Sequence, residues 1–220
     1  MKSIRIKVVV LALSVLFMSA SYAEETVISI GHQEIVIPEL DSFYSVMNEQ
    51  LLGFMDEMIP EKRKHLAYFV DKNTPLSRKH IVFAIPAGTE SNTFSKSDFL
   101  ALSNRLKEGD TTKAALKPGK ISTRKAIFSI GGITPMGVFL ENDRAIGFIN
   151  VYEENVEING RLESGKTANA FVLLLLKGRI LAMNIITSFE FTKDIDWLKR
   201  KAHIWSAQII DANSKSPFFK

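Results

Sequence analysis

Residues 170–189 read AFVLLLLKGRILAMNIITSF, and this segment sets the expected architecture of the chain. It holds two apolar runs, Ala170–Leu176 and Ile180–Phe189, which Lys177-Gly178-Arg179 separates. Two charges at the centre of a membrane span are costly, so the pattern argues against a transmembrane helix. A tight turn between two buried strands explains it better, and the sequence predicts a hairpin of core strands here.

Further short strands are predicted just before this hairpin. They are neighbours in the sequence and are separated by the turn signals Gly131-Gly132, Asn142-Asp143 and Asn159-Gly160. Short, closely spaced strands are typical of an antiparallel meander rather than of a parallel sheet. The predicted strands are Ala126–Ile130, Met136–Leu140, Ala145–Tyr152 and Val156–Ile158.

The first third of the chain adds two more strand pairs. Thr26–Ile30 and Glu34–Ile37 are β-rich runs joined by Gly31-His32-Gln33, which predicts a hairpin. His65–Val70 and Lys79–Ile85 are read as a second pair of strands, with turn residues between them.

Two helices are predicted before residue 110. The first contains Met47, Met55 and Met58 on an apolar stripe with three- and four-residue spacing, and it ends at Pro60. Adaptable methionines could also form a ligand or partner face, but a core stripe is the favoured interpretation. The second helix begins after Ser95, a natural N-cap.

The second helix carries further signals, and a third helix follows the last strand. Phe94 and Phe99 form a hydrophobic staple around the N-cap, and Gly109 supplies the stop. The third helix is predicted from Lys193 to Ala212, with Thr192 as its cap. Helices segregated from an antiparallel sheet define the α+β class, so we expect a single meander-like sheet with about three flanking helices.

Residues 1–23 have the layout of a cleavable secretory signal peptide. Three basic residues precede the apolar run Val8–Met18, and the small residues Ser21 and Ala23 lie where signal peptidase cuts. The apolar run is shorter than the roughly 20 residues that span a bilayer as a helix. We therefore expect residues 24–220 to form one exported α+β domain without a membrane span.

Charge and composition refine this expectation. The 28 basic residues of the chain less the three in residues 1–23 leave 25, against 24 acidic residues, so the exported part has a net charge of +1. This near-neutral balance disfavours nucleic acid as a partner. The absence of cysteine and of Asn-x-Ser/Thr acceptors favours a bacterial periplasmic or secreted protein without disulfides.

Residues 107–125 form a polar, basic connection that is interpreted as a loop. Pro118-Gly119 breaks any long helix there. The segment could dock an acidic partner or anionic lipid headgroups, but a solvated loop is the favoured interpretation. Its basic residues are Lys107, Lys113, Lys117, Lys120, Arg124 and Lys125.

The four histidines give at most a weak metal signal. None of His32, His65, His80 and His203 stands in a His-x-x-x-His or Glu-flanked pattern. His65 and His80 each begin a predicted strand, so a metal could bridge them if the two strands pair. His203 lies beside a basic run and is interpreted as a surface residue of the last helix.

Other chemical motifs are equally weak. Thiol nucleophiles are excluded, and no Gly-x-Ser-x-Gly elbow appears. Gly131-Gly132 is read as a β-turn, because a phosphate cradle needs a further glycine and a helix start. Glu153-Glu154 and Glu157 could serve glycoside hydrolysis or bind calcium, but a solvated turn is favoured. Glu154 and His65 are the residues that an activity screen would substitute first.

The close of the chain resembles small exported bacterial proteins of the PsbP-like type. The resemblance rests on the strand pair within residues 170–189, on Asp194-Ile-Asp-Trp197, on Trp205-Ser-Ala-Gln-Ile-Ile210 and on the opening Ile35-Val-Ile-Pro38. It implies an antiparallel sheet flanked by helices, with a final aromatic-bearing helix packed on the sheet. It also implies a non-enzymatic accessory or binding module, and it transfers no functional residue.

These observations favour an exported, non-enzymatic binding or accessory module. No catalytic, cofactor-binding or metal-ligating residue is assigned, and no cofactor is expected. One alternative is a periplasmic hydrolase or metal-dependent enzyme whose site is assembled from residues distant in the sequence. Another is a secreted factor that acts on another cell. The ligand or partner and the oligomeric state are left open.

Overall fold

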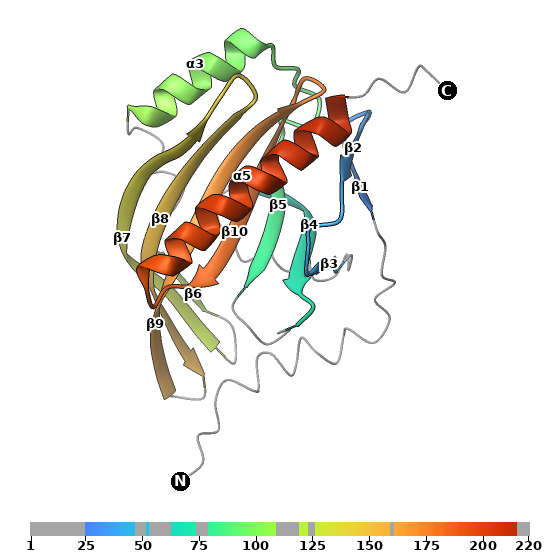
Figure 1. Cartoon of the computed structure of the whole chain (residues 1–220). Helices are drawn as coiled ribbons and strands as arrows, with labels where there is room; N and C mark the ends of the chain where they lie inside the picture. The colour runs from blue at the N-terminus through green and yellow to red at the C-terminus, as the bar shows by residue number, and fades with distance from the viewer. Residues whose placement is uncertain are drawn as a thin grey trace.

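The computed structural model describes residues 25–46, 52, 63–73, 79–108, 119–122, 126–158 and 161–214. These residues form two antiparallel sheets and two helices (Figure 1). The elements are β1 (Thr26–Ile30), β2 (Gln33–Ile37), β3 (Phe43–Ser45), β4 (Arg63–Asp71), β5 (His80–Pro86), α3 (Lys96–Lys107), β6 (Gly119–Ser122), β7 (Ala126–Glu141), β8 (Ala145–Ile158), β9 (Arg161–Leu176), β10 (Arg179–Ser188) and α5 (Thr192–Ser214).

The large sheet joins two meanders edge to edge. Its eight strands lie in the order β3-β4-β5-β10-β9-β8-β7-β6, and every neighbouring pair is antiparallel. The chain runs from the edge strand β3 through β4 to the inner strand β5, and then crosses to the opposite edge of the sheet. From there it returns through β6 to β10, so that β10 pairs with β5. The hairpin β1–β2 forms a separate two-stranded sheet.

The predicted fold class is wrong. We expected an α+β fold with a single meander-like sheet and about three flanking helices. The described chain is mostly β, with an eight-stranded sheet, a second two-stranded sheet and two helices. Met47, Met55 and Met58 of the predicted first helix lie outside the described residues.

The prediction failed because glycines and polar residues were read as turns. Gly131-Gly132 lies inside the continuous strand β7, where the pairing with β8 shifts register between Gly131 and Thr134. A β-bulge absorbs an extra residue without ending a strand, so the two strands predicted on either side of these glycines are one. The basic connection 107–125 likewise contains a strand, β6.

One face of the large sheet packs against α5 and the β1–β2 hairpin, and we call it the α5 face. Successive residues of a strand point to opposite faces, so every second residue of the central strands, such as Ile149, Leu174 and Met183, belongs to this core. The helix contributes a stripe with three- and four-residue spacing, which makes one face of the helix apolar. The stripe consists of Ile195, Leu198, Ala202, Trp205 and Ile209.

The other face of the large sheet packs against α3, and we call it the α3 face. The predicted start of this helix is confirmed: Ser95 is the N-cap, and a capping box joins it to Asp98. Phe94 and Phe99 both pack in the cluster that α3 forms with the sheet, as the predicted staple requires. Hydrogen bonds from Ser95 also hold the pKa of the Asp98 carboxyl below its ordinary value.

Several other sequence predictions agree with the structure. The opening hairpin is present, with Gly31 in the left-handed region at φ 60° in its turn. The hairpin inside residues 170–189 is β9–β10, whose turn contains Lys177 and Gly178, both with positive φ. Neither described helix is long and apolar enough to cross a membrane.

Candidate functional site

The α3 face changes from apolar to polar along β8. Ile146 and Phe148 pack beneath α3, and the next residues on the same face are Asn150, Tyr152 and Glu154. On the opposite face, Ile149 and Val151 remain in the apolar core. A polar residue at every second position, starting where α3 ends, marks this part of the sheet as different from an ordinary core surface.

Three buried asparagines lie side by side on the α3 face, one on each of β8, β9 and β10, and we call them the amide row. Asn150 stands directly opposite Asn169 in the β8–β9 register, and the Nδ2 of Asn169 donates to the Oδ1 of Asn184 at 3.4 Å. All three side chains are more than nine-tenths buried.

The hydrogen-bonding capacity of the amide row is incompletely used. The Oδ1 of Asn169 is buried and accepts no hydrogen bond. Asn150 is 3% exposed, and its amide makes no hydrogen bond to any residue within the described ranges, but its amide atoms are not fully sealed from solvent. Leaving a buried polar group unpaired costs about 1–3 kcal/mol, and this cost applies to the sealed Oδ1 of Asn169, whereas the Asn150 amide remains accessible to a small partner.

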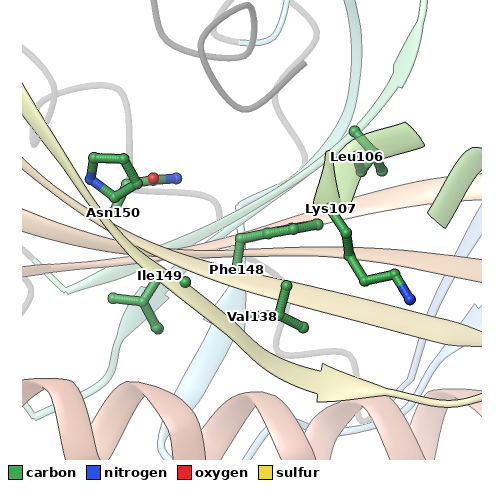
Figure 2. A pocket seen from close by; sticks show the side chains of 8 residues that line it. Leu106, Lys107, Val138, Phe148, Ile149 and Asn150 are labelled. Atoms are coloured by element: carbon green, nitrogen blue, oxygen red, sulfur yellow. The ribbon is translucent and has the colours of Figure 1, made fainter. Parts of the chain in front are cut away.

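A pocket of about 180 Å³ opens beside Asn150, between the end of α3 and the strands β7 and β8. Figure 2 shows Asn150 at one end of this pocket and Leu106 and Lys107 of α3 at the other, with Phe148 and Val138 between them. The full lining is Leu106, Lys107, Pro135, Gly137, Val138, Phe148, Ile149 and Asn150.

Irregular pairing in β7 shapes one wall of the pocket. The β7–β8 register shifts between Pro135 and Gly137 and again between Val138 and Leu140, and Gly137 adopts φ 89°. Each bulge leaves one residue of β7 without a ladder partner and bends the strand away from its neighbour. Met136, the residue displaced by the first of these shifts, is 53% exposed, and Val138 is 40% exposed. Of these two exposed residues, Val138 lines the pocket.

The pocket has little net charge. Lys107 is the charged residue of its lining, and its Nζ lies 2.6 Å from the Glu141 carboxylate. Both partners are partly exposed, so the pair neutralises the rim and contributes little to stability. The other lining residues are apolar, apart from the Asn150 amide and main-chain groups.

The polar groups beyond the pocket on the same face include the phenols of Tyr68 and Tyr152 and the hydrogen-bonded carboxylate of Glu154. Burial raises the pKa of Tyr152 well above its ordinary value, and the nearby Glu154 charge adds to the shift. The Glu154 carboxylate accepts a hydrogen bond from Thr167 Oγ1 at 2.9 Å. Desolvation, with a contribution from Tyr44, raises the pKa of Tyr68 to about 12. Both phenols therefore stay protonated through neutral pH.

The histidines proposed as a metal pair are far apart. β4 and β5 do pair, but His65 stands opposite Ala84 whereas His80 stands opposite Val70. The four-residue offset along β5 corresponds to about 13 Å, too far for two ligands of one metal. His80 instead packs against the ring of Tyr68, with ring centroids 5.5 Å apart.

The other two histidines are exposed and lie away from the pocket. His32 is in the β1–β2 turn, and His203 on α5 makes an edge-on contact with Phe139, whose ring centroid is 5.7 Å from its own. Within the described residues, no group of three or more His, Asp and Glu side chains is arranged to hold a metal ion.

The acidic residues proposed as a carboxylate pair do not face each other. Glu153 and Glu154 are consecutive residues inside β8, so their side chains point to opposite faces of the sheet. The prediction of a solvated turn here is wrong, since the strand continues to Ile158. The Glu157 side chain lies outside the described part of the structure, as do the side chain of Lys120 and the other predicted basic loop residues beyond Lys107.

Sequence reasoning missed Asn150 and its neighbours. Asn150, Asn169 and Asn184 each interrupt an apolar strand segment, and that interruption was visible in the sequence. A single asparagine in such a segment usually indicates a strand end or a bulge. Only the register of β8, β9 and β10 shows that the three residues share one face.

Comparisons with known proteins give only a weak fold-level likeness. No protein-family model matches the chain, and no curated protein matches it. Among solved structures, the solution structure of a cyanobacterial PsbP (CyanoP) from Synechocystis sp. PCC 6803 matches over 84% of this chain and 93% of its own length. The TM-score is 0.32 and the sequence identity is 10%, so the likeness transfers neither residues nor an activity.

Proposed function

We propose that the protein is an exported, non-enzymatic binding module whose ligand, or one group of whose partner, enters the pocket between α3 and the β7–β8 pair. The observation that carries this proposal is the Asn150 amide, which is buried at the pocket and has no hydrogen-bond partner among the described residues. A bound molecule that hydrogen-bonds to Asn150 would use the one side-chain amide of an otherwise largely apolar lining.

The chemistry of the pocket favours binding over catalysis. Its lining offers an amide, a lysine already paired with Glu141 and apolar side chains. A nucleophile activated by a general base, or a pair of carboxylates with separated pKa values, is what hydrolysis would require. The lining supplies neither, and it does supply the mixture of apolar wall and single polar anchor that is typical of a ligand pocket.

The pocket can be tested by closing its mouth. Val138 is 40% exposed, so Val138→Phe adds bulk at the mouth without placing it in the core. The full-length protein, purified gently from its own host, is examined by native mass spectrometry beside the variant. We expect the wild type to carry a bound small molecule or protein that Val138→Phe loses. A bound species that Val138→Phe retains in full would contradict the assignment of the pocket.

The export part of the proposal rests on the pattern of residues 1–23 and has its own test. The intact mass of the protein recovered from the periplasm or the medium should correspond to a chain beginning at Glu24. Its distribution between these two fractions separates a periplasmic module from a secreted factor. A protein that stays in the cytoplasm with Met1 still present would refute export and leave the pocket assignment unaffected.

A further inference from the structure

Building on the proposed binding function, we infer that the pocket selects an uncharged group of about the size of one aromatic ring that bears a primary carboxamide. Three properties of the described residues support this class of ligand: the volume of the pocket, the hydrogen-bonding groups at its polar end, and the charge at its rim.

The volume limits the ligand to one compact group. An apolar protein cavity of roughly 150 Å³ accommodates benzene, and this pocket measures about 180 Å³. Leu106, Val138 and Phe148 supply apolar surface around such a ring. A drug-sized ligand needs a larger pocket, so only one ring-sized portion of any larger molecule would enter.

The unused hydrogen-bonding groups require donors as well as an acceptor. Asn150, which lines the pocket, offers its Oδ1 as an acceptor and its Nδ2 as a donor. Asn169 stands opposite Asn150 but is not part of the pocket lining, and its Oδ1 is sealed, so it adds no contact for a ligand. A primary carboxamide carries N–H donors and a carbonyl acceptor, so it can bond both the Oδ1 and the Nδ2 of Asn150.

Charged head groups match it poorly. A carboxylate has no hydrogen to give to the Oδ1 of Asn150. An ammonium group has no acceptor for the Nδ2 of Asn150. Either ion would also lose its hydration in an apolar pocket whose one charged lining residue, Lys107, is already paired with Glu141.

Three probes of equal ring size separate these possibilities: benzamide, benzoate and toluene. Each is titrated into the full-length protein, and binding is followed by the chemical shifts of Phe148 and Val138. Two additional hydrogen bonds correspond to roughly tenfold in affinity, so we expect benzamide to bind at least about tenfold more tightly than either other probe.

Variants tie the preference to Asn150. In Asn150→Leu, benzamide should bind no more tightly than toluene. Asn155→Ala removes an asparagine from the same strand that does not line the pocket and whose Oδ1 accepts from Ser164, and this control should keep the full preference. Thermal unfolding of each variant verifies that it is folded, and Val138→Phe should weaken all three probes together.

The outcomes distinguish the ligand class from the proposed function. Tightest binding by benzoate, lost in Lys107→Ala, would overturn the carboxamide class and preserve the pocket as a binding site. Equal binding of benzamide and toluene would also overturn it, since Asn150 would then play no part. If no probe shifts the pocket signals and the protein from its host carries no bound species, both the class and the proposed function fail.

Discussion

The two faces of the central strands are built from the same segments of chain but are completed in different ways. On the α5 face, β8, β9 and β10 present aliphatic side chains, and the helix stripe closes the core over them. On the α3 face, the same strands present Ile146 and Phe148 under the helix and then Asn150 with its neighbours. The change from apolar to polar side chains along these strands distinguishes the α3 face from the sealed core on the α5 face.

The contrast is clearest between two buried asparagines. Asn213, on α5, donates from its Nδ2 to the carbonyl oxygens of Val36 and Ile209, and its Oδ1 accepts from the Val36 amide at 2.9 Å. This side chain fastens the β1–β2 hairpin to the helix. Asn150 is buried to a similar degree but makes none of these bonds within the described structure. Burial alone therefore does not distinguish a structural amide from a binding amide, whereas the accounting of hydrogen bonds does.

The largest effect should come from the centre of the α5 face. Trp205 is fully buried, packs edge-on against Phe43 and Trp197, and its Nε1 donates to the Asp41 carboxylate at 3.3 Å. Trp205→Ala leaves a cavity and removes the hydrogen bond to Asp41. We therefore expect a loss of about 3–5 kcal/mol in the free energy of unfolding, measured by urea denaturation. A loss below about 1 kcal/mol would show that α5 does not close this core.

Substitutions of Asn213 and Asn150 should affect stability differently. Asn213→Ala breaks three hydrogen bonds and leaves the main chain of Val36 unpaired, so it should lower the free energy of unfolding by about 1–3 kcal/mol. Asn150→Leu replaces an amide without a described hydrogen bond by an apolar side chain of similar branched shape beside the pocket, and it should leave stability unchanged or increase it. Both are measured by urea denaturation of ligand-free protein. Equal losses in the two variants would mean that Asn150 is a structural amide.

The buried phenols predict a loss of stability at alkaline pH. The folded-state pKa values of Tyr68 and Tyr152 both lie above the ordinary tyrosine value near 10, the first at about 12. A raised pKa means that the folded state holds the proton more tightly. This contribution to stability is complete below about pH 10 and declines as the pH rises toward and through the folded-state values.

The melting temperature measured between pH 8 and pH 11.5 tests this expectation. Tyr152→Phe removes one of the two phenols and should make the alkaline decline shallower. A decline of the same steepness in wild type and variant would show that Tyr152 ionises as freely in the folded protein as in the unfolded chain.

The smallest effect should come from the rim of the α3 face. Lys107 and Glu141 are partly exposed and form a single surface ion pair. Lys107→Ala should therefore change the free energy of unfolding by less than about 1 kcal/mol, with a smaller change at high salt. A substantially larger loss would indicate that the Lys107–Glu141 ion pair is needed to hold α3 on the sheet.

Local signals predicted local structure well. The capping box at Ser95, the staple of Phe94 and Phe99, and the turn at Lys177-Gly178 depend on residues close in sequence, and the structure has all three. The pairing of β5 with β10 brings together Ala84 and Ala182, nearly a hundred residues apart. No local periodicity encodes such a pairing, because it is decided by which faces bury the most apolar surface.

The candidate site was beyond sequence reasoning for the same reason. Gly131-Gly132 has the composition of a turn, but the neighbouring strand β8 continues past it and holds β7 as one bent strand. In the sequence, Asn150 is a single asparagine in an apolar strand segment. Only the β8–β9 register shows that it lies opposite Asn169. Residue type predicted the strands, and the register between distant strands determined which residues meet.

The most direct measurement compares the side-chain amide signals of Asn150 and Asn213 in two-dimensional ¹H–¹⁵N NMR spectra, with and without benzamide. If Asn150 is a binding amide and Asn213 a structural one, saturating benzamide should shift the Asn150 signals and slow their hydrogen exchange. The Asn213 signals should stay in place. Shifts elsewhere with an unmoved Asn150, or no shift at any pocket residue, would contradict the assignment of the α3 face as the binding face.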